Sequence, residues 1–239
     1  MPLLGTLYGV GVGPGDPELL TLKAVRVLRE ADVVFASTQE RSGKSLALEI
    51  ASPHLPPGRE VVPLAFPHTF RGVEERQAHR AHARTVLEAL RRPASVAFLT
   101  LGDPMTYSTF SYLLEALREL VSDLPVVVVP GITSYSASAA EARVPLAEGD
   151  EGLAIVSAAK GTARLRSALD GFENVVVMKP YRHIAKVCDV LEERGLTDQA
   201  LFCVECSRPG GMILRDLREV RALPRRYMSL FLVKRGRIP

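Results

Sequence analysis

The chain has 239 residues, of which 47% are hydrophobic and 24% are charged, and its formal net charge of +3 is too small to indicate nucleic-acid binding by itself. No apolar run approaches the length of a bilayer-spanning helix, and the N-terminal MPLLGTLYGV lacks the basic flank of a signal peptide, so no membrane partner is expected. Three cysteines, an odd number, argue against a disulfide scaffold, and we expect reduced thiols and a cytoplasmic location.

Strand-like and helix-like segments alternate in the first 130 residues. The apolar run Leu7–Val12 predicts a strand, and apolar residues three apart between Glu18 and Glu30 predict an amphipathic helix. The further expected elements are a strand over 31–36, helices over 45–51 and 73–91, a strand over 95–101, a helix over 110–121 and a strand over 125–129. This alternation predicts a largely parallel sheet with helices on both faces.

The pattern restarts after Pro145 and the acidic turn at residues 148–152. Strands are expected over 153–157, 174–178, 200–204 and 228–233, and helices over 162–169 and 183–194. We therefore expect two α/β lobes with mostly parallel sheets. The N-terminal domain would span residues 1–130 and the C-terminal domain residues 131–239, with a ligand cleft between them.

A glycine loop follows the first expected strand, with glycines at positions 9, 11, 13 and 15. Asp32 lies at the sequence distance at which a dinucleotide-binding fold has its ribose-binding acid. The spacing nevertheless differs from G-x-G-x-x-G, and Pro14 and Pro17 remove N–H groups that a pyrophosphate needs. A dehydrogenase is therefore disfavoured.

The segment Ser42-Gly43-Lys44-Ser45 resembles the end of a phosphate-binding P-loop. Such a loop needs a glycine five residues before Gly43, where the backbone turns around phosphate, and this chain has Thr38 there. A P-loop ATPase remains the alternative from another class of protein.

The cysteine pair, two histidines and the arginine clusters do not by themselves indicate a functional site. Cys203 and Cys206 form a single C-x-x-C pair, which cannot complete a tetrahedral zinc site, and no metal is expected. His79 and His82 share a helix face and are interpreted as solvated. Arginine clusters at 91–92, 164/166 and 225–226 suit carboxylate partners but are equally explained as solvated surface.

Two polar loops directly follow expected strands, namely GDPMTYST at 102–109 and PGITSYS at 130–136. A glycine at the carboxyl end of a strand lets the backbone approach a ligand closely. In open α/β sheets this end of the strands is where ligands bind. Each loop alone is explained by a tight turn or a helix cap, but the two together predict a shared pocket.

Taken together, five segments resemble the tetrapyrrole methylase family. They are GVGPGDPELLTLKA (11–24), ADVVFA (31–36), TLGDPMTYSTFSYL (100–113), VPGITSYSASAA (129–140) and VVVMKP (175–180). GDPMTYSTF followed by PGITSYSASAA is most similar to the branch that methylates precorrin-2 at C-20 in corrin (cobalamin) biosynthesis. The uroporphyrinogen-III methylases, the alternative within the family, carry GGDPF followed by Phe-Gly, where this chain has Met105 and Tyr107-Ser108.

The resemblance implies a homodimeric methyltransferase that uses S-adenosyl-L-methionine, bound in the cleft between the lobes, to methylate an acidic tetrapyrrole. Whether the macrocycle arrives as precorrin-2 or as cobalt-factor II stays open. No general base can be chosen among Asp103, Tyr107 and the histidines.

The resemblance also implies roles for individual residues. Gly102, Asp103 and Thr106, with Tyr107 in the same loop, would line the methionine and ribose side of the cofactor. Thr133 and Ser134 would contact its methionine portion. The remaining expected cofactor contacts are Met178, against the adenine, Cys206 and Ser229. Gly13, Pro14 and Gly15 would border the tetrapyrrole trough.

Overall fold

A computed structural model describes residues 4–39, 43–66, 73–91 and 94–236. The chain divides into two compact units, Met1–Thr133 and Ser134–Pro239. The division falls three residues beyond the boundary expected from the sequence, and Gly131 lies against Gly11 and Gly102 of unit 1.

Unit 1 contains a five-stranded sheet of order β3-β2-β4-β1-β5, in which every pair of neighbours is parallel. Its strands are β1 (Thr6–Gly11), β2 (Val33–Gln39), β3 (Glu60–Phe66), β4 (Ser95–Thr100) and β5 (Val126–Val129). Its helices are α1 (Leu22–Glu30), α2 (Leu46–Ala51), α3 (Val73–Leu90) and α4 (Thr109–Leu120).

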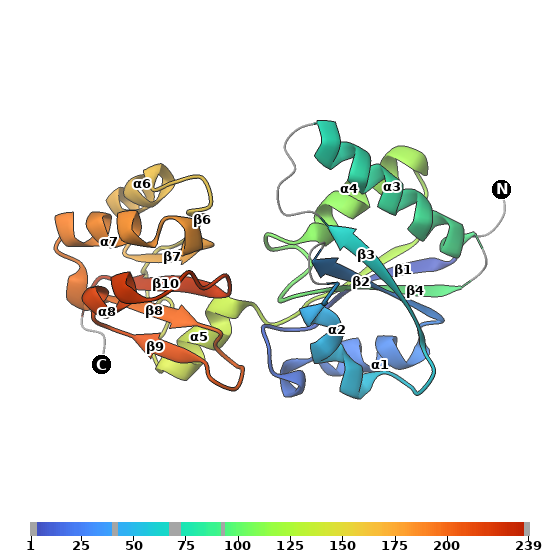
Figure 1. The fold of residues 1–239 in the computed structure, drawn as a ribbon, viewed down its shortest axis with the longest axis horizontal. Coiled ribbons are helices and arrows are strands. Elements are labelled where there is room, and N and C mark those ends of the chain that lie inside the picture. The colour runs from blue at the N-terminus through green and yellow to red at the C-terminus, as the bar shows by residue number, and fades with distance from the viewer. Residues whose placement is uncertain (1–3, 40–42, 67–72, 92–93, 237–239) are drawn as a thin grey trace. The chain divides into compact units, whose positions relative to one another are not determined.

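The strand order explains which face of the sheet each helix covers. From β1 to β3 the chain moves toward one edge of the sheet, and from β3 to β5 it moves toward the other. Because such crossovers are right-handed, the two sets of helices fall on opposite faces. Val27 of α1 and Ile50 of α2 pack on one face, and Val86 of α3 and Leu117 of α4 pack on the other (Figure 1).

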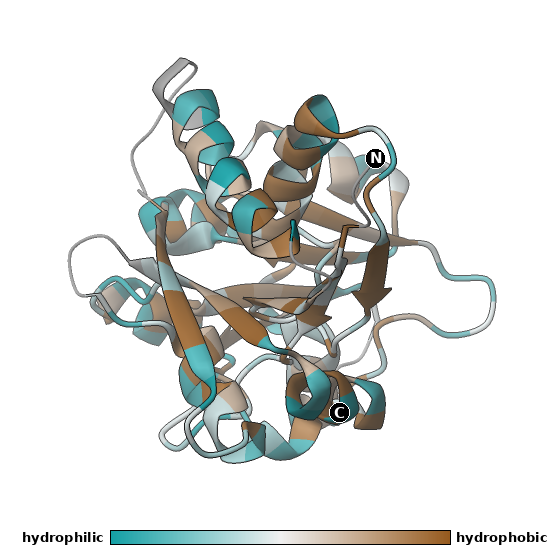
Figure 2. Cartoon of the chain, turned by 90° about the vertical axis from the view of Figure 1, so that its right-hand side faces the viewer, coloured by the Kyte–Doolittle hydropathy of each residue, from teal (hydrophilic) through white to brown (hydrophobic). Residues whose placement is uncertain are grey.

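The helices are amphipathic, as their sequence pattern predicts. Figure 2 shows the hydrophobic strands in brown, between helices whose hydrophilic residues, in teal, lie on the outside. Thr21 caps α1 by accepting from the Ala24 N–H at 3.1 Å, and Ser45 caps α2 by accepting from the Leu48 N–H at 3.2 Å. Ser45 therefore has a structural role that does not require phosphate.

Neighbouring strands β1 and β4 send their following loops to opposite faces of the sheet, since α1 and α4 lie on opposite faces. In open α/β sheets this is the topological position at which ligands bind, at the carboxyl ends of the strands.

Unit 2 contains a five-stranded sheet of order β6-β7-β10-β8-β9. Its strands are β6 (Leu153–Ser157), β7 (Asn174–Met178), β8 (Ala200–Val204), β9 (Met212–Leu214) and β10 (Ser229–Lys234). Its helices are α5 (Ser134–Ala142), α6 (Ala163–Gly171), α7 (Ile184–Glu193) and α8 (Leu217–Ala222).

The unit-2 sheet is mixed, whereas mostly parallel sheets were expected in both lobes. Only the β6–β7 pair is parallel, and β10 runs antiparallel to both β7 and β8. The reason lies in the short connections after β8. A turn reverses the chain into β9, and α8 then returns it to the carboxyl end of β7, from which β10 must run in the opposite direction.

The two faces of the unit-2 sheet are covered differently. Helices α6, α7 and α8 pack on one face around Phe202 and Phe231, whose ring centroids lie 4.7 Å apart. The other face, with Leu201 and Leu230, packs against α5 (Figure 1). Within the described residues, no helix has both the length and the hydropathy needed to span a membrane.

Candidate functional site

Three glycines bring the loops after β1, β4 and β5 of unit 1 into direct backbone contact. A Cβ added at Gly131 would lie 2.1 Å from the Gly102 carbonyl oxygen, and one added at Gly11 would lie 2.7 Å from the Gly131 nitrogen. Gly13 and Gly102 also exchange two hydrogen bonds, of 3.3 and 2.7 Å. Only glycine permits this approach, so the expected convergence of these loops has a steric basis.

Asp103 connects two of these loops through its carboxylate. Its Oδ1 accepts from the Met105 N–H at 2.8 Å, and its Oδ2 accepts from the Gly131 N–H at 3.1 Å. The Thr106 hydroxyl lies 3.4 Å from Oδ1. Both carboxylate oxygens therefore have partners within the protein, and Asp103 holds the 102–109 loop against the loop after β5.

The base of the 102–109 loop is closed by a buried hydroxyl pair. Thr100 Oγ1 and Ser108 Oγ lie 2.7 Å apart, and Ser108 caps α4 by accepting from the Phe110 N–H at 3.0 Å. Between them Tyr107 adopts a left-handed backbone conformation with φ 51° and is 44% exposed. Sequence reasoning missed Thr100 and Ser108, although a serine directly before a helix is a recognisable cap signal.

The residues expected to border the substrate differ in accessibility. Gly13 (φ 78°) and Pro14 are buried, whereas Gly15 is partly exposed. Gly13 therefore acts through its bridge to Gly102, and Gly15 is the position of the three with accessible surface. Thr133 and Ser134, each partly exposed, lie on the two sides of the division between the units.

In unit 2 the expected site residues gather at one end of the sheet. Met178 ends β7 and Ser229 begins β10, and the register pairs Leu230 with Met178 and Ser229 with Val204. Cys206 follows β8 at the same end and is 8% exposed. Met178, Cys206 and Ser229 are thus neighbours although they are separated in sequence.

Comparison with known proteins shows the family of the chain. Residues 6–220 match the Tetrapyrrole (Corrin/Porphyrin) Methylases. The chain belongs to this family. The resemblance of its five sequence segments to tetrapyrrole methylases is thereby confirmed.

Two relatives of this tetrapyrrole methylase match along nearly their whole length. The cobalt-precorrin-2 C(20)-methyltransferase of Salmonella typhimurium is 35% identical over 236 residues, which cover 97% of each chain. The precorrin-2 C(20)-methyltransferase of Sinorhizobium sp is 34% identical over 239 residues, covering 96% of this chain and 95% of the relative. A solved structure of uroporphyrin-III C-methyl transferase from Thermus thermophilus, complexed with S-adenyl homocysteine, is 31% identical with a TM-score of 0.65 and covers 96% of this chain and 97% of its own.

The residues that suggested a dinucleotide-binding fold or a P-loop have structural roles in this methylase. Asp32 precedes β2 at the amino end of the sheet, opposite to the glycine loops, where its Oδ2 accepts from the Ser95 N–H at 2.7 Å. Thr38 lies within β2, paired with Ala65 of β3, and not in a loop. Ser42 lies outside the described residues, so nothing is said of its position.

The two thiols of the C-x-x-C pair interact with each other. Cys203 is buried in β8, and its hydrogen bond with Cys206, together with burial, raises the pKa of its thiol. The same hydrogen bond lowers the pKa of Cys206. Among the residues that the structure describes, no group of three His, Cys, Asp or Glu side chains is arranged to hold a metal ion.

The interpretation of His79 and His82 as solvated is wrong. The His82 ring packs on Phe66 with a centroid distance of 4.4 Å, and its Nδ1 is buried. Burial, and then the charge of His79, lowers the pKa of His82. His79 stacks on Tyr112 at 5.3 Å with an interplanar angle of 4°. The aromatic neighbours come from β3 and α4, which the helix pattern alone does not reveal.

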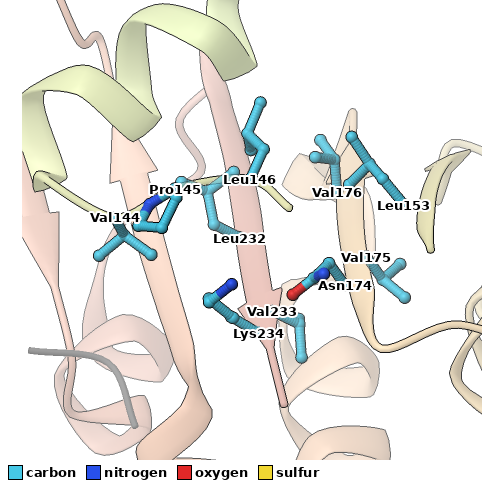
Figure 3. A pocket seen from close by; sticks show the side chains of 10 residues that line it. All are labelled: Val144, Pro145, Leu146, Leu153, Asn174, Val175, Val176, Leu232, Val233 and Lys234. Carbon is cyan, nitrogen blue, oxygen red and sulfur yellow. The ribbon is translucent and has the colours of Figure 1, made fainter. Parts of the chain in front are cut away.

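Unit 2 contains a cavity that is too small for either a cofactor or a macrocycle. Figure 3 shows the side chains of β7, β10 and their neighbours that line it, among them Asn174 and Lys234. Its volume of about 10 Å³ has room for about one water molecule. The Oδ1 of Asn174 is buried without a hydrogen-bond partner in the protein, which suits such a water.

Proposed function

We propose that this tetrapyrrole methylase transfers the methyl group of S-adenosyl-L-methionine to C-20 of precorrin-2 or of its cobalt-containing counterpart. The observation that carries the proposal is the match, at 34–35% identity and over at least 95% of each chain, to two enzymes named as C(20)-methyltransferases. The substrate class follows from those names, and the cofactor from the family and from the neighbour complexed with S-adenyl homocysteine.

The loops of unit 1 are suited to a ligand of this kind. Gly102 has φ 68°, and the space where its Cβ would lie contains a single neighbour, the Ile132 carbonyl oxygen at 3.9 Å. A ligand can therefore approach the main chain of Gly102 without meeting a side chain. We assign the methionine and ribose portions of the cofactor to Gly102, Asp103, Thr106 and Tyr107.

The other cofactor contacts are assigned by the resemblance. Thr133 and Ser134 would hold the methionine portion, and Met178, Cys206 and Ser229 would contact the remainder. The 13–15 segment would border the tetrapyrrole, with Gly15 as its accessible residue. The homodimer and the cytoplasmic location stay predictions, the first of which light scattering in solution would test.

The cofactor supplies an electrophilic methyl group on a sulfonium, and the work of the protein is alignment and exclusion of water. The 102–109 loop contributes rigidity to this alignment. Its backbone is hydrogen-bonded to Gly13 through Gly102, its Asp103 carboxylate accepts from the Gly131 N–H, and the Thr100–Ser108 pair closes its base. Residues held in this way keep their geometry when a ligand binds, which reduces the entropy lost on binding.

The test is product analysis with both macrocycles. Purified protein, methyl-labelled cofactor and either precorrin-2 or its cobalt form should give a product one methyl group heavier, with the label at C-20 by NMR. Transfer to another ring position would assign the chain to another branch of the family.

Calorimetry should show S-adenosylhomocysteine binding at micromolar Kd or tighter, about −8 kcal/mol, and no comparable binding of magnesium-ATP or NAD. Tight ATP binding without a response to S-adenosylhomocysteine would refute the proposal.

A further inference from the structure

One end of the unit-2 sheet carries a cluster of two arginines and two tyrosines. Tyr181 and Arg182 lie in the 3-10 turn Pro180–Arg182 after β7, and Arg226 and Tyr227 lie just before β10. The two tyrosine rings are 5.1 Å apart, and the Arg182 guanidinium carbon lies 5.5 Å from the centre of the Tyr181 ring. We call these four residues the arginine–tyrosine cluster.

The arginines of this cluster differ from those on the helices of unit 2. Arg166 pairs with Glu193 at 2.6 Å, Arg194 with Asp170 at 2.5 Å, and Arg221 with Asp189 at 2.8 Å. In the part of the chain that the structure describes, neither Arg182 nor Arg226 has a carboxylate within ion-pair distance. Positive charge that lacks a counter-ion inside the protein is suited to an anion from outside it.

The guanidinium of Arg226 also contains an unpaired donor. Its Nε is buried and has no hydrogen-bond partner. A buried N–H without an acceptor costs stability, so the protein itself leaves this guanidinium incompletely satisfied. The main chain at this position is held in place, because the Ser229 hydroxyl donates to the Arg226 carbonyl at 2.7 Å.

The tyrosines add a flat, partly accessible surface with a donor group. Tyr227 is 49% exposed, and burial around its phenol, followed by the effect of Tyr181, raises its pKa. Its hydroxyl therefore stays protonated at neutral pH and is able to donate a hydrogen bond. The Arg182 guanidinium lies over the Tyr181 ring, a cation–π arrangement, and its fork has the geometry that binds a carboxylate through two hydrogen bonds.

We propose that Arg182 and Arg226, together with Tyr181 and Tyr227, bind carboxylate arms of the tetrapyrrole substrate. This inference rests on the proposed function, and it assigns recognition of the acidic side chains to unit 2. Met178 and Ser229, the proposed cofactor contacts, lie at the same end of the sheet. A macrocycle with several acetate and propionate groups matches an end of the sheet that carries two arginines and two tyrosines.

Binding of uroporphyrin, a stable and fluorescent polycarboxylate tetrapyrrole, tests the inference. Arg182→Gln and Arg226→Gln should each raise the Kd for uroporphyrin about tenfold, the scale of one charge-assisted hydrogen bond. The loss should shrink as salt rises, because accessible charge pairs are screened. Arg182→Lys should restore binding only in part, since lysine keeps the charge but lacks the fork. Coproporphyrin, which has fewer carboxylates, should bind more weakly and lose less in the variants.

Arg166→Gln is the matched control, because Arg166 lies on a helix of the same unit and is already paired. It should leave uroporphyrin binding unchanged, and circular dichroism checks that every variant is folded. The inference is overturned if the wild type does not bind uroporphyrin, if both cluster variants bind it as tightly as the wild type, or if Arg166→Gln weakens binding equally.

S-adenosylhomocysteine affinity separates this inference from the proposed function. It should be the same in the wild type and in both cluster variants. A wild type that binds uroporphyrin through these arginines but ignores S-adenosylhomocysteine would refute the methyltransferase and leave the anion site standing. A wild type that binds S-adenosylhomocysteine, with cluster variants that retain full uroporphyrin affinity, would refute only the cluster.

Discussion

Gly131 shows how strongly a single residue can constrain the loops of unit 1. The atom that a Cβ would meet, 2.1 Å away, is a main-chain oxygen of Gly102, which cannot move aside as a flexible side chain would. We expect Gly131→Ala to lower the free energy of unfolding by about 1–3 kcal/mol and to abolish S-adenosylhomocysteine binding, as measured by urea denaturation and calorimetry. Gly171, at the end of α6, has no atom within 4 Å of its Cβ position. Gly171→Ala should therefore be neutral or slightly stabilising.

Asp103 has a structural role beside the cofactor contact expected from the sequence. In Asp103→Asn an amide N–H would face the N–H of Met105 or of Gly131, where the carboxylate now accepts. We expect a loss of about 1–3 kcal/mol of stability in the protein without ligand, accompanied by weaker S-adenosylhomocysteine binding. Asp150→Asn, in an exposed turn, provides the control. Weaker cofactor binding with unchanged stability would show that the loop does not depend on these hydrogen bonds.

Some features of individual residues could be predicted from the sequence, and others could not. Gly102, Gly131 and Asp103 could be singled out as candidates because they lie in short motifs after apolar strands. The Thr100–Ser108 contact and the packing of His82 on Phe66 could not, because each joins side chains whose proximity depends on tertiary structure. Likewise, the arginine clusters look alike in the sequence, and only the structure separates the paired Arg166 from the unpaired Arg226.

At the scale of elements, β1 packs closely against α4 because Gly9 has no side chain. A Cβ at Gly9 would lie 2.3 Å from the ring of Phe110, which is fully buried. Gly9→Ala should therefore cost about 1–3 kcal/mol by denaturant unfolding, the scale of overpacking in a core. The double variant Gly9→Ala/Phe110→Leu should cost less than the sum of the two single changes. Strict additivity would mean that the two positions do not compete for space.

Elements with a strong periodic pattern were predicted and the irregular ones were not. The segment that forms β3 contains Pro63, which argues against a strand, yet β3 lies at the edge of the sheet, where a missing N–H is tolerated. The three-residue β9 is too short for a periodic signal, and α8 was not predicted either. They are also the elements that reverse the chain, so the mixed order of the unit-2 sheet could not be foreseen.

For the molecule as a whole, one ionic network gives stability a dependence on pH. Lys234, 8% exposed at the end of β10, lies 2.8 Å from Glu151 and 3.1 Å from Glu148. The hydrogen bond from Lys234, then that from Asn174, lowers the pKa of Glu151. Burial alone would lower the pKa of Lys234, but its bonds to the two glutamates raise it.

The sign of the effect follows from these directions. A carboxylate whose pKa is lowered in the folded state stabilises the fold above its ordinary pKa, and this contribution disappears as pH falls through the folded-state value. Glu151→Gln should therefore lower the melting temperature at pH 7, and the difference from the wild type should shrink as the pH falls below the ordinary pKa of a glutamate. Glu30→Gln, in an exposed pair with Arg26, should change little at any pH. A difference for Glu151→Gln that stays constant as the pH is lowered would contradict the assignment.

The glycine contacts between the loops of unit 1 have a consequence for how such a protein can change. They involve main-chain atoms, and the Asp103 carboxylate strengthens them by accepting hydrogen bonds from Met105 and Gly131. Met105, in the same loop as Asp103, is 60% exposed and takes part in that framework only through its backbone N–H. Substitutions at Met105 can therefore alter the exposed surface of this loop while leaving its scaffold intact. Change at the surface of the loop and persistence of its backbone framework are thus separable in this fold.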